Sequence, residues 1–412
     1  METFVKALAD RVPGHDVVVY TSAEPGAERH DAALPYPVIR DRARTLLPTP
    51  RATRRAAAIA RAHGCDRVWF GAAAPLAAMA PGLRRLAPGI RRTVATTHGH
   101  EIWWARTPGA RALLRRIGRG TDVVTYLGDY TRARIAPALG PDARLARLVP
   151  GVDPSVFRPA GAPARTGTAI TGTDSAGTAI TGTDSAGTEV PSAAPVVLCV
   201  ARLVPRKGQD VLIRALPAIR RAVPGTTLVL VGRGPDEDRL RGLAHRVTEP
   251  GSVVFTGGLD HAGTAVHYAG ADVFAMPCRT RRLGLEAEGL GIVFLEAAAA
   301  GLPVVAGRSG GAPDTVLDGV TGTVVDGRAP AEVAAALTRI LLAPPAERAR
   351  MGAAGRRWAE EHWTWGASAR RLTELLDPAV PLPGSTTPVM PNAQAAPAAS
   401  AAPVTPAAPA GA

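Results

Sequence analysis

The second half of the chain alternates between apolar runs and segments with helically spaced apolar residues. Val196–Val200 and Thr227–Val231 are almost entirely apolar, the pattern of strands buried on both faces. Between them, Gln209–Ala222 has a helical spacing of apolar residues. Such alternation predicts a parallel sheet with right-handed crossovers. We expect further strands at Val253–Phe255, Ala271–Met276 and Pro303–Ala306, and helices at Asp236–Val247, His261–Ala269, Ile292–Ala300, Ala331–Leu342 and Pro345–Glu361.

The first part of the chain shows the same alternation more weakly, which predicts a second Rossmann-like domain. The expected fold class is therefore α/β, with two doubly wound parallel-sheet domains that face a cleft. Strands are predicted at Asp16–Tyr20, Arg67–Phe70, Thr93–Thr96 and Asp122–Tyr126, and helices at Thr53–His63, around Ala110–Ile117 and at Thr131–Leu139.

The chain begins on a predicted helix, Glu2–Arg11, and not on a strand. A doubly wound domain usually starts with a strand and a glycine-containing turn. We therefore predict that the N-terminal domain lacks its first strand, which would leave apolar helix faces and strand edges exposed. On this interpretation the chain as written is unstable or poorly active.

A low-complexity segment separates the two halves. Within residues 161–194 the decapeptide TAITGTDSAG occurs twice in tandem, at Thr168–Gly177 and Thr178–Gly187. Residues of this kind cannot bury a core, so we expect a flexible linker, with a β-hairpin as the alternative. The predicted organisation is an N-terminal domain over 1–155, this linker, a C-terminal domain over 195–360, a closing helix over 361–377 and a disordered Ala/Pro-rich tail over 378–412.

Positive charge is concentrated in the first domain. The formal net charge of the chain is +13, and residues 1–150 contain 24 basic and 12 acidic residues. This excess favours an anionic partner such as a phospholipid surface, with a solvated arginine-rich surface as the alternative. No aromatic residues alternate with the arginines as in a nucleic-acid platform, so we expect no nucleic-acid partner.

The sequence also bears on the location of the protein and on metals. No signal-peptide pattern and no apolar stretch of about 18 residues is present, so we expect a cytoplasmic protein that associates peripherally with the membrane. Cys65, Cys199 and Cys278 stand alone, which argues against a structural zinc site and a disulfide framework. The sequence does not predict an oligomeric state.

Two glutamates eight residues apart, Glu288 and Glu296, lie in EGLGIVFLE. The glycine-rich loop of Gly289 and Gly291 opens a helix near Ile292, whose N-terminal amides are suited to a diphosphate or a sugar hydroxyl. The carboxylates are suited to the hydroxyls of a sugar and a ribose. On spacing alone, a capping box beside a surface glutamate is the favoured interpretation.

Two further loops follow predicted strands, at the sheet edge where open α/β folds bind ligands. Arg202 and Lys207 follow Val196–Val200 and are suited to a diphosphate, although a solvated basic loop that includes Arg206 is the alternative. His98 follows Thr93–Thr96 in TTHGHE. It either faces the cleft, where it contacts a transferred sugar, or is a loop histidine bonded to backbone.

Together these residues resemble glycosyltransferase family 4, which has the GT-B fold. The resemblance rests on Glu288-x7-Glu296, RLVPRKG with Arg202 and Lys207, and GLPVVAGRSGGAPD at Gly301–Asp314. Within the family the chain is most similar to actinobacterial GDP-mannose-dependent phosphatidylinositol mannoside mannosyltransferases. The segments THGHEIWW, PGARALLRRIG and MPCRTRRLGLEAEGLGIVFLEA carry that closer match.

The resemblance implies a retaining transfer of mannose from GDP-mannose to a phosphatidylinositol mannoside-type lipid at the inner membrane face. One alternative is a family 4 glycosyltransferase that uses another nucleotide sugar or acceptor. The other is an inactive nucleotide- or membrane-binding protein. No cofactor and no metal ion are expected. The implied catalytic residues are His98 and Glu288, which contact the sugar. The implied donor-binding residues are Arg202 and Lys207 for the diphosphate, Glu296 for the ribose, and the backbone of Gly289, Leu290, Gly291 and Ile292.

Overall fold

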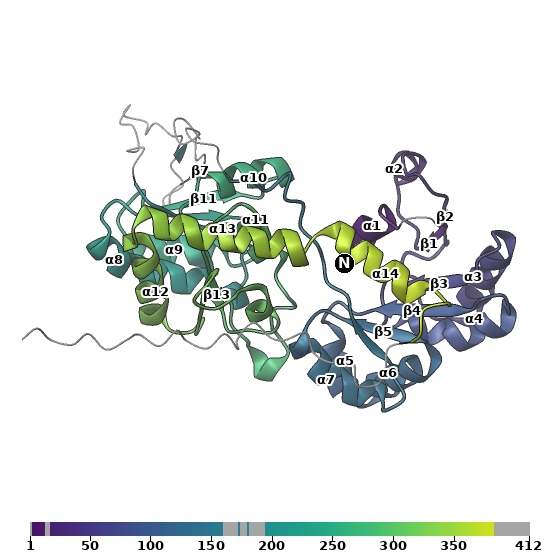
Figure 1. The fold of residues 1–412 in the computed structure, drawn as a ribbon. Coiled ribbons are helices and arrows are strands. Elements are labelled where there is room, and N and C mark those ends of the chain that lie inside the picture. The colour runs from purple at the N-terminus through teal and green to yellow at the C-terminus, as the bar shows by residue number, and fades with distance from the viewer. Residues whose placement is uncertain (1, 13–16, 160–171, 174–178, 181–193, 383–412) are drawn as a thin grey trace, which may run out of the picture.

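The computed structural model describes residues 2–12, 17–159, 172–173, 179–180 and 194–382. Each half of the chain contains a parallel sheet with helices packed around it, and the two halves lie side by side (Figure 1). The predicted α/β class is confirmed, and most predicted elements lie within a few residues of the observed ones.

The C-terminal domain is built on a parallel sheet with the strand order β14-β13-β12-β9-β10-β11. Its central strands are buried on both faces, which explains why their sequences are apolar without alternation. In register, Val197 of β9 pairs with Leu228 of β10 on one side and with Val273 of β12 on the other. The strands are β9 (Val196–Val200), β10 (Thr227–Val231), β11 (Val253–Gly257), β12 (Val273–Met276), β13 (Val304–Gly307) and β14 (Gly322–Val325).

Helices cover this sheet on both sides. Among them α8 packs against α9 and α12, and α11 packs against α13. The helices are α8 (Gln209–Ala222), α9 (Glu237–Val247), α10 (His261–Ala269), α11 (Ile292–Ala299), α12 (Pro330–Leu342) and α13 (Pro345–His362). Short 3-10 turns occur at Pro205–Lys207, Arg282–Gly284 and Ala312–Thr315.

The N-terminal domain contains a four-stranded parallel sheet in chain order, β3-β4-β5-β6, and a separate two-stranded parallel sheet, β1-β2. The predicted strand Asp16–Tyr20 is observed only from Val19, and Asp16 lies outside the described residues. The strands are β1 (Val19–Thr21), β2 (Val38–Arg40), β3 (Arg67–Phe70), β4 (Arg92–Thr96), β5 (Val123–Tyr126) and β6 (Leu145–Arg147).

Two helices of this domain, the ones at Pro50–Ala62 and Pro108–Gly120, are strongly amphipathic and bury one face. The helix predicted at Thr53–His63 begins earlier, at Pro50, because the Thr49 side chain accepts a hydrogen bond from the Ala52 amide and caps the first turn. The helices are α2 (Glu28–Ala32), α3 (Pro50–Ala62), α4 (Ala80–Leu86), α5 (Glu101–Arg106), α6 (Pro108–Gly120) and α7 (Asp129–Leu139), with a 3-10 turn at Leu76–Met79.

The first and last helices of the described chain, α1 (Glu2–Ala9) and α14 (Trp365–Leu376), pack against each other. Figure 1 shows α14 leaving the C-terminal domain and lying beside α1 on the N-terminal domain. Phe4 and Leu8 of α1 are buried in a cluster with Leu372 and Leu375 of α14. The prediction of exposed apolar helix faces is therefore wrong for α1. The absence of a first strand stays a prediction.

Five residues of the low-complexity segment are described, at 172–173, 179–180 and 194. Gly172–Thr173 (β7) and Ala179–Ile180 (β8) form an antiparallel pair, and β7 pairs with Phe255 at the edge of the C-terminal sheet. This pairing agrees locally with the hairpin alternative. The rest of the predicted linker and most of the predicted tail lie outside the described residues.

Candidate active site at the domain interface

Loops from both domains meet at the carboxyl ends of their strands. The loop after β4 contains His98 and Gly99, and the loop before α11 contains Glu288 and Gly289. A Cβ atom on Gly99 would be in van der Waals contact with the Cα atom of Gly289, at 3.5 Å, so the two loops lie close to each other. The structure therefore brings the two predicted parts of the site together across the interface.

Glu288 is the centre of a charged cluster in the C-terminal domain. Its Oε2 atom lies 2.7 Å from Nζ of Lys207 and 2.8 Å from a guanidinium nitrogen of Arg206. The Glu288 side chain is only 8% exposed and that of Lys207 only 11%. Because both cations bind Oε2, the Oε1 atom is left as an acceptor for a ligand hydroxyl. Two cations around one carboxylate give the cluster a net positive charge.

The SGG segment after β13 fixes the backbone of Glu288. The Gly311 amide donates a 3.0 Å hydrogen bond to the Glu288 carbonyl, and the Ser309 hydroxyl accepts from the Glu288 amide at 3.3 Å. Gly310 has a φ of 59°, and a Cβ atom there would lie 1.7 Å from the Glu288 carbonyl oxygen. Only glycine permits this approach, so the motif sets the position of the carboxylate.

The N-terminus of α11 follows directly. Gly291 adopts a left-handed conformation with a φ of 90°, and Leu290 is buried in the core of the C-terminal domain. Within the described part of the chain, no acceptor binds the amides of Gly289, Leu290, Gly291 or Ile292. Unpaired amides at a helix N-terminus are suited to an anion.

Glu296 lies one turn inside α11 and faces the interior of the domain. Its Oε2 atom accepts a 3.0 Å hydrogen bond from the hydroxyl of Tyr268, which is fully buried. Burial raises the pKa of Glu296 to about 7, against the lowering effect of that hydrogen bond. The Tyr268 contact holds this carboxyl in place, and part of its side chain remains accessible to a ligand.

His98 is held from the N-terminal domain. Its Nε2 atom lies 2.6 Å from the Gly71 carbonyl oxygen. A carbonyl can only accept, so Nε2 carries the proton and Nδ1 is an acceptor. Burial lowers the pKa of His98 to about 4. The imidazole is therefore neutral at physiological pH, where it acts as a hydrogen-bonding group and not as a cation.

Glu101, in the first turn of α5, positions the His98 loop. Its side chain is fully buried, and Oε2 accepts hydrogen bonds of 3.0 Å from the amides of both His98 and Gly99. Its Oε1 atom lies 3.4 Å from Nε2 of His100. Burial raises the pKa of Glu101. The HxHE pattern thus serves to hold a loop. In the described residues no group of three or more His, Cys, Asp or Glu is arranged to hold a metal ion.

The neutral state of buried His98 predicts a specific pH dependence of stability. Below pH 6.5 the unfolded chain binds a proton that the folded protein does not bind until about pH 4. The stability contributed by neutral His98 is therefore lost as the pH falls from 6.5 towards 4. In His98→Gln we expect the difference in free energy of unfolding between pH 7.5 and pH 5 to shrink by about 2 kcal/mol. Urea unfolding at the two pH values measures it.

His63→Gln serves as the control, because His63 is an exposed histidine at the end of α3. It should keep the pH dependence of the unchanged protein. The same pH dependence in His98→Gln as in the unchanged protein would show that His98 is not held neutral.

The structure brings together most, but not all, of the predicted site residues. Lys207, Glu288 and the His98 loop converge, and Glu296 lies one turn deeper. Arg202 is exposed, and its guanidinium forms no ion pair within the residues that the structure describes. Arg206, which the sequence suggested only as part of a solvated loop, binds Glu288 directly. The sequence analysis assigns no role to Glu101 or to the pair Gly310–Gly311, which lie in the HxHE and SGG motifs.

Comparison with known proteins identifies the family of this chain. The family described as Glycosyltransferase Family 4 matches residues 1–156, and the one described as Glycosyl transferases group 1 matches residues 182–358. A GDP-mannose-dependent alpha-(1-6)-phosphatidylinositol monomannoside mannosyltransferase from Mycolicibacterium smegmatis is 48% identical over 382 residues, which cover 91% of this chain and 93% of that protein. This chain belongs to glycosyltransferase family 4. A GDP-mannose-dependent monoacylated alpha-(1-6)-phosphatidylinositol monomannoside mannosyltransferase from Corynebacterium glutamicum is 43% identical. The match covers 87% of this chain and 89% of that protein.

Solved structures of other glycosyltransferases share the architecture. Sucrose-phosphate synthase from Thermosynechococcus elongatus has a TM-score of 0.66 at 23% identity and covers 90% of each chain. The lipopolysaccharide glycosyltransferase WaaG has a TM-score of 0.57 at 18% identity and covers 91% of this chain and 94% of its own. This similarity confirms the GT-B fold that the family resemblance implied.

Proposed function

We propose that this family 4 enzyme transfers mannose from GDP-mannose to a phosphatidylinositol monomannoside, with retention of the anomeric configuration. The observation that carries the proposal is the cluster of Lys207, Arg206 and Glu288. It lies beside the unpaired amides of α11 and opposite the His98 loop. The near relatives, whose names specify this donor and this type of acceptor, support the choice of substrate.

The donor diphosphate would bind between the cations and α11. Lys207 and Arg206 lie at one carboxylate oxygen, and the amides of Gly289 to Ile292 provide further donors. Positive groups fixed at the diphosphate stabilise the charge that develops on the departing GDP. We propose that these groups provide that stabilisation without a metal ion. Arg202, which is exposed in the loop after β9, would turn towards the diphosphate when donor binds.

The sugar and the ribose would be held by three side chains. The free Oε1 atom of Glu288 would accept a hydrogen bond from a mannose hydroxyl. The unprotonated Nδ1 atom of His98 would accept another from the opposite side. Glu296, steadied by Tyr268, would bind the ribose hydroxyls. Because Glu288 and His98 belong to different domains, the sugar would be gripped only where both domains meet.

The acceptor would approach from a membrane surface. In the described part of the chain no helix is both long and apolar enough to span a bilayer. We propose peripheral association, supported by the positive charge of the first 150 residues. The acceptor hydroxyl would lose its proton to an oxygen of the departing diphosphate on the face where the bond to GDP breaks. Such a front-face transfer retains configuration.

The proposal is tested with labelled GDP-mannose, purified protein and vesicles that contain phosphatidylinositol monomannoside. We expect labelled phosphatidylinositol dimannoside, identified by mass spectrometry, with an α-linkage. UDP-glucose replaces the donor, and inositol 3-phosphate replaces the lipid, as controls that should give little product. Transfer to inositol 3-phosphate with none to the lipid would refute the proposed acceptor.

A further inference from the structure

The loop between β12 and α11 presents leucines to solvent. Leu283 is 91% exposed and Leu285 is 45% exposed. The loop is closed at its base, where Arg281 and Glu286 form an antiparallel bridge. Arg282 and Leu283 both have positive φ values, 48° and 53°, which are uncommon for residues other than glycine. A fixed conformation thus holds a leucine out of the protein at the tip of the loop.

An exposed tryptophan of the other domain adjoins this tip. Trp103 on α5 is 51% exposed, and Arg106 lies three residues later, on the same side of the helix. The Arg106 guanidinium donates a hydrogen bond to the Leu283 carbonyl. The tip of the loop and the outer face of α5 therefore form one surface, which we call the docking surface: Trp103, Arg106, Arg281, Arg282, Leu283 and Leu285.

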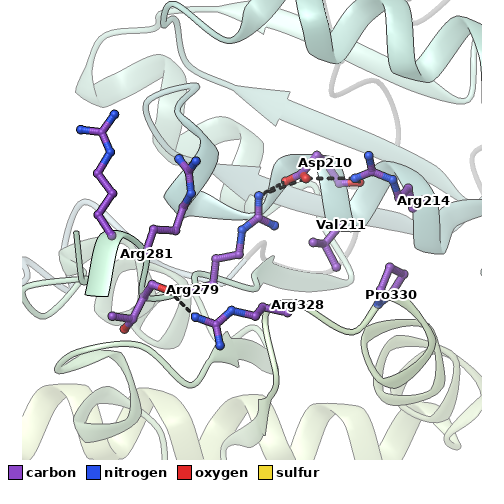
Figure 2. A pocket seen from close by; sticks show the side chains of 9 residues that line it. Asp210, Val211, Arg214, Arg279, Arg281, Arg328 and Pro330 are labelled. Carbon is purple, nitrogen blue, oxygen red and sulfur yellow. Dashed lines mark hydrogen bonds and ion pairs between the residues drawn. The ribbon is translucent and has the colours of Figure 1, made fainter. Parts of the chain in front are cut away.

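A basic cavity lies at the foot of the same loop. It has a volume of about 480 Å³, and Figure 2 shows Asp210 on its wall, held between Arg279 and Arg214. Asp210 is the single acidic residue of its lining, against five arginines: Arg214, Arg279, Arg281, Arg282 and Arg328. Glu286 pairs with two of these, and the group as a whole remains positively charged. Arginine side chains bind phosphate groups through planar, multiple hydrogen bonds.

We propose that the docking surface binds an anionic lipid bilayer. In this arrangement Leu283, Leu285 and Trp103 enter the interface, and the arginines of the docking surface and the cavity contact lipid phosphates. Aromatic and aliphatic side chains bordered by basic residues are the composition that binds at such interfaces. The positive charge of the arginines complements an anionic bilayer, and the protruding Leu283 and Leu285 are suited to insertion into it.

The position of this surface fits the proposed function. The purpose that we infer for membrane binding rests on that proposed function. The loop leads directly into Glu288, and α5 follows directly after the His98 loop. A bilayer bound here would therefore lie beside the mouth of the site. The head group of a lipid acceptor would then have only a short distance to travel into the cleft, while its acyl chains stay in the membrane.

Vesicle sedimentation tests the proposal with the full chain. One set of vesicles contains phosphatidylcholine with one third phosphatidylglycerol, and the other contains phosphatidylcholine alone. We expect binding to the anionic set that weakens with salt. Leu283→Asp with Leu285→Asp should lower the partition coefficient at least about tenfold, and Arg281→Gln with Arg282→Gln by about tenfold or more. Leu342→Asp is the matched control, because Leu342 is 61% exposed on α12 and should change nothing.

The outcomes separate this inference from the proposed function. Unchanged vesicle binding by the leucine double variant, or an equal loss in Leu342→Asp, would overturn it whatever the enzyme transfers. Selective loss of vesicle binding, with GDP binding in the absence of lipid and the melting temperature both unchanged, would support it. That result would hold even if the acceptor proved to be a different lipid.

Discussion

Replacing Lys207 with alanine is expected to lower the rate of mannose transfer by at least about 100-fold. The Lys207 ammonium lies 2.7 Å from Glu288 and is almost buried, so its charge acts in a site from which water is largely excluded. Its loss removes a positive group from the place proposed for the diphosphate. Steady-state kinetics with varied GDP-mannose, together with GDP binding by calorimetry, measures the effect. Both transfer and GDP affinity should fall.

The chain contains only two lysines, Lys6 and Lys207, among 48 basic residues. Lys6→Ala is therefore the natural control, because Lys6 forms an exposed pair with Asp10 on α1, and such pairs contribute little. Lys207→Arg adds a sharper test. A guanidinium is larger and planar, and we expect it to restore GDP affinity in part while transfer stays low. Transfer by Lys207→Ala at the rate of the unchanged protein would refute the role of Lys207.

Replacing Glu288 with glutamine is expected to reduce transfer by about 100- to 1000-fold while GDP binding persists. The change keeps the shape of the side chain but removes the negative charge that Lys207 and Arg206 share. A mannose hydroxyl would lose its charged acceptor, whereas the diphosphate would lose a repulsive neighbour. GDP affinity should therefore stay constant or rise, opposite to the result for Lys207→Ala.

Glutamine is preferred to alanine at this position, because an empty site would leave two cations beside a buried gap. Thermal unfolding should show that Glu288→Gln remains folded. The comparison of GDP with GDP-mannose affinity identifies the sugar contact, since only the latter should weaken. If both ligands weaken equally, Glu288 orders the cations and does not bind the sugar.

The strands of the C-terminal domain could be predicted closely because they are buried on both faces. Val196–Val200 and Thr227–Val231 are observed with the predicted bounds. In an α/β domain, a continuous apolar run of that length usually forms a strand buried on both faces. β14 was not predicted. It contains Gly322 and Thr323 at an edge of the sheet, where the demand for apolar residues is weaker. The N-terminal strands β2 and β6 are three residues long and give little pattern.

The candidate site could be predicted in its residue types but not in its pairings. Sequence motifs identified Lys207 and Glu288, yet no pattern indicates that Arg206, and not Arg202, reaches Glu288. That choice depends on the 3-10 turn Pro205–Lys207, which directs the two adjacent cations to the same carboxylate. Likewise, the partly buried hydrogen bond between His98 and Gly71 joins residues 27 positions apart. Distances of this kind follow from tertiary packing and leave no local signal.

The position of α14 has a consequence for the order in which parts of the protein fold during synthesis. Leu372 and Leu375 lie in the same buried cluster as Phe4, Val94 and Val123, although they are among the last described residues. On the ribosome, domains generally fold as they emerge. The main buried cluster of the N-terminal domain contains only its own residues, but the cluster that includes α1 must wait for the entire C-terminal domain before it is complete. During that interval the apolar face of α1 lacks its cover, and a chaperone has its longest opportunity to bind there.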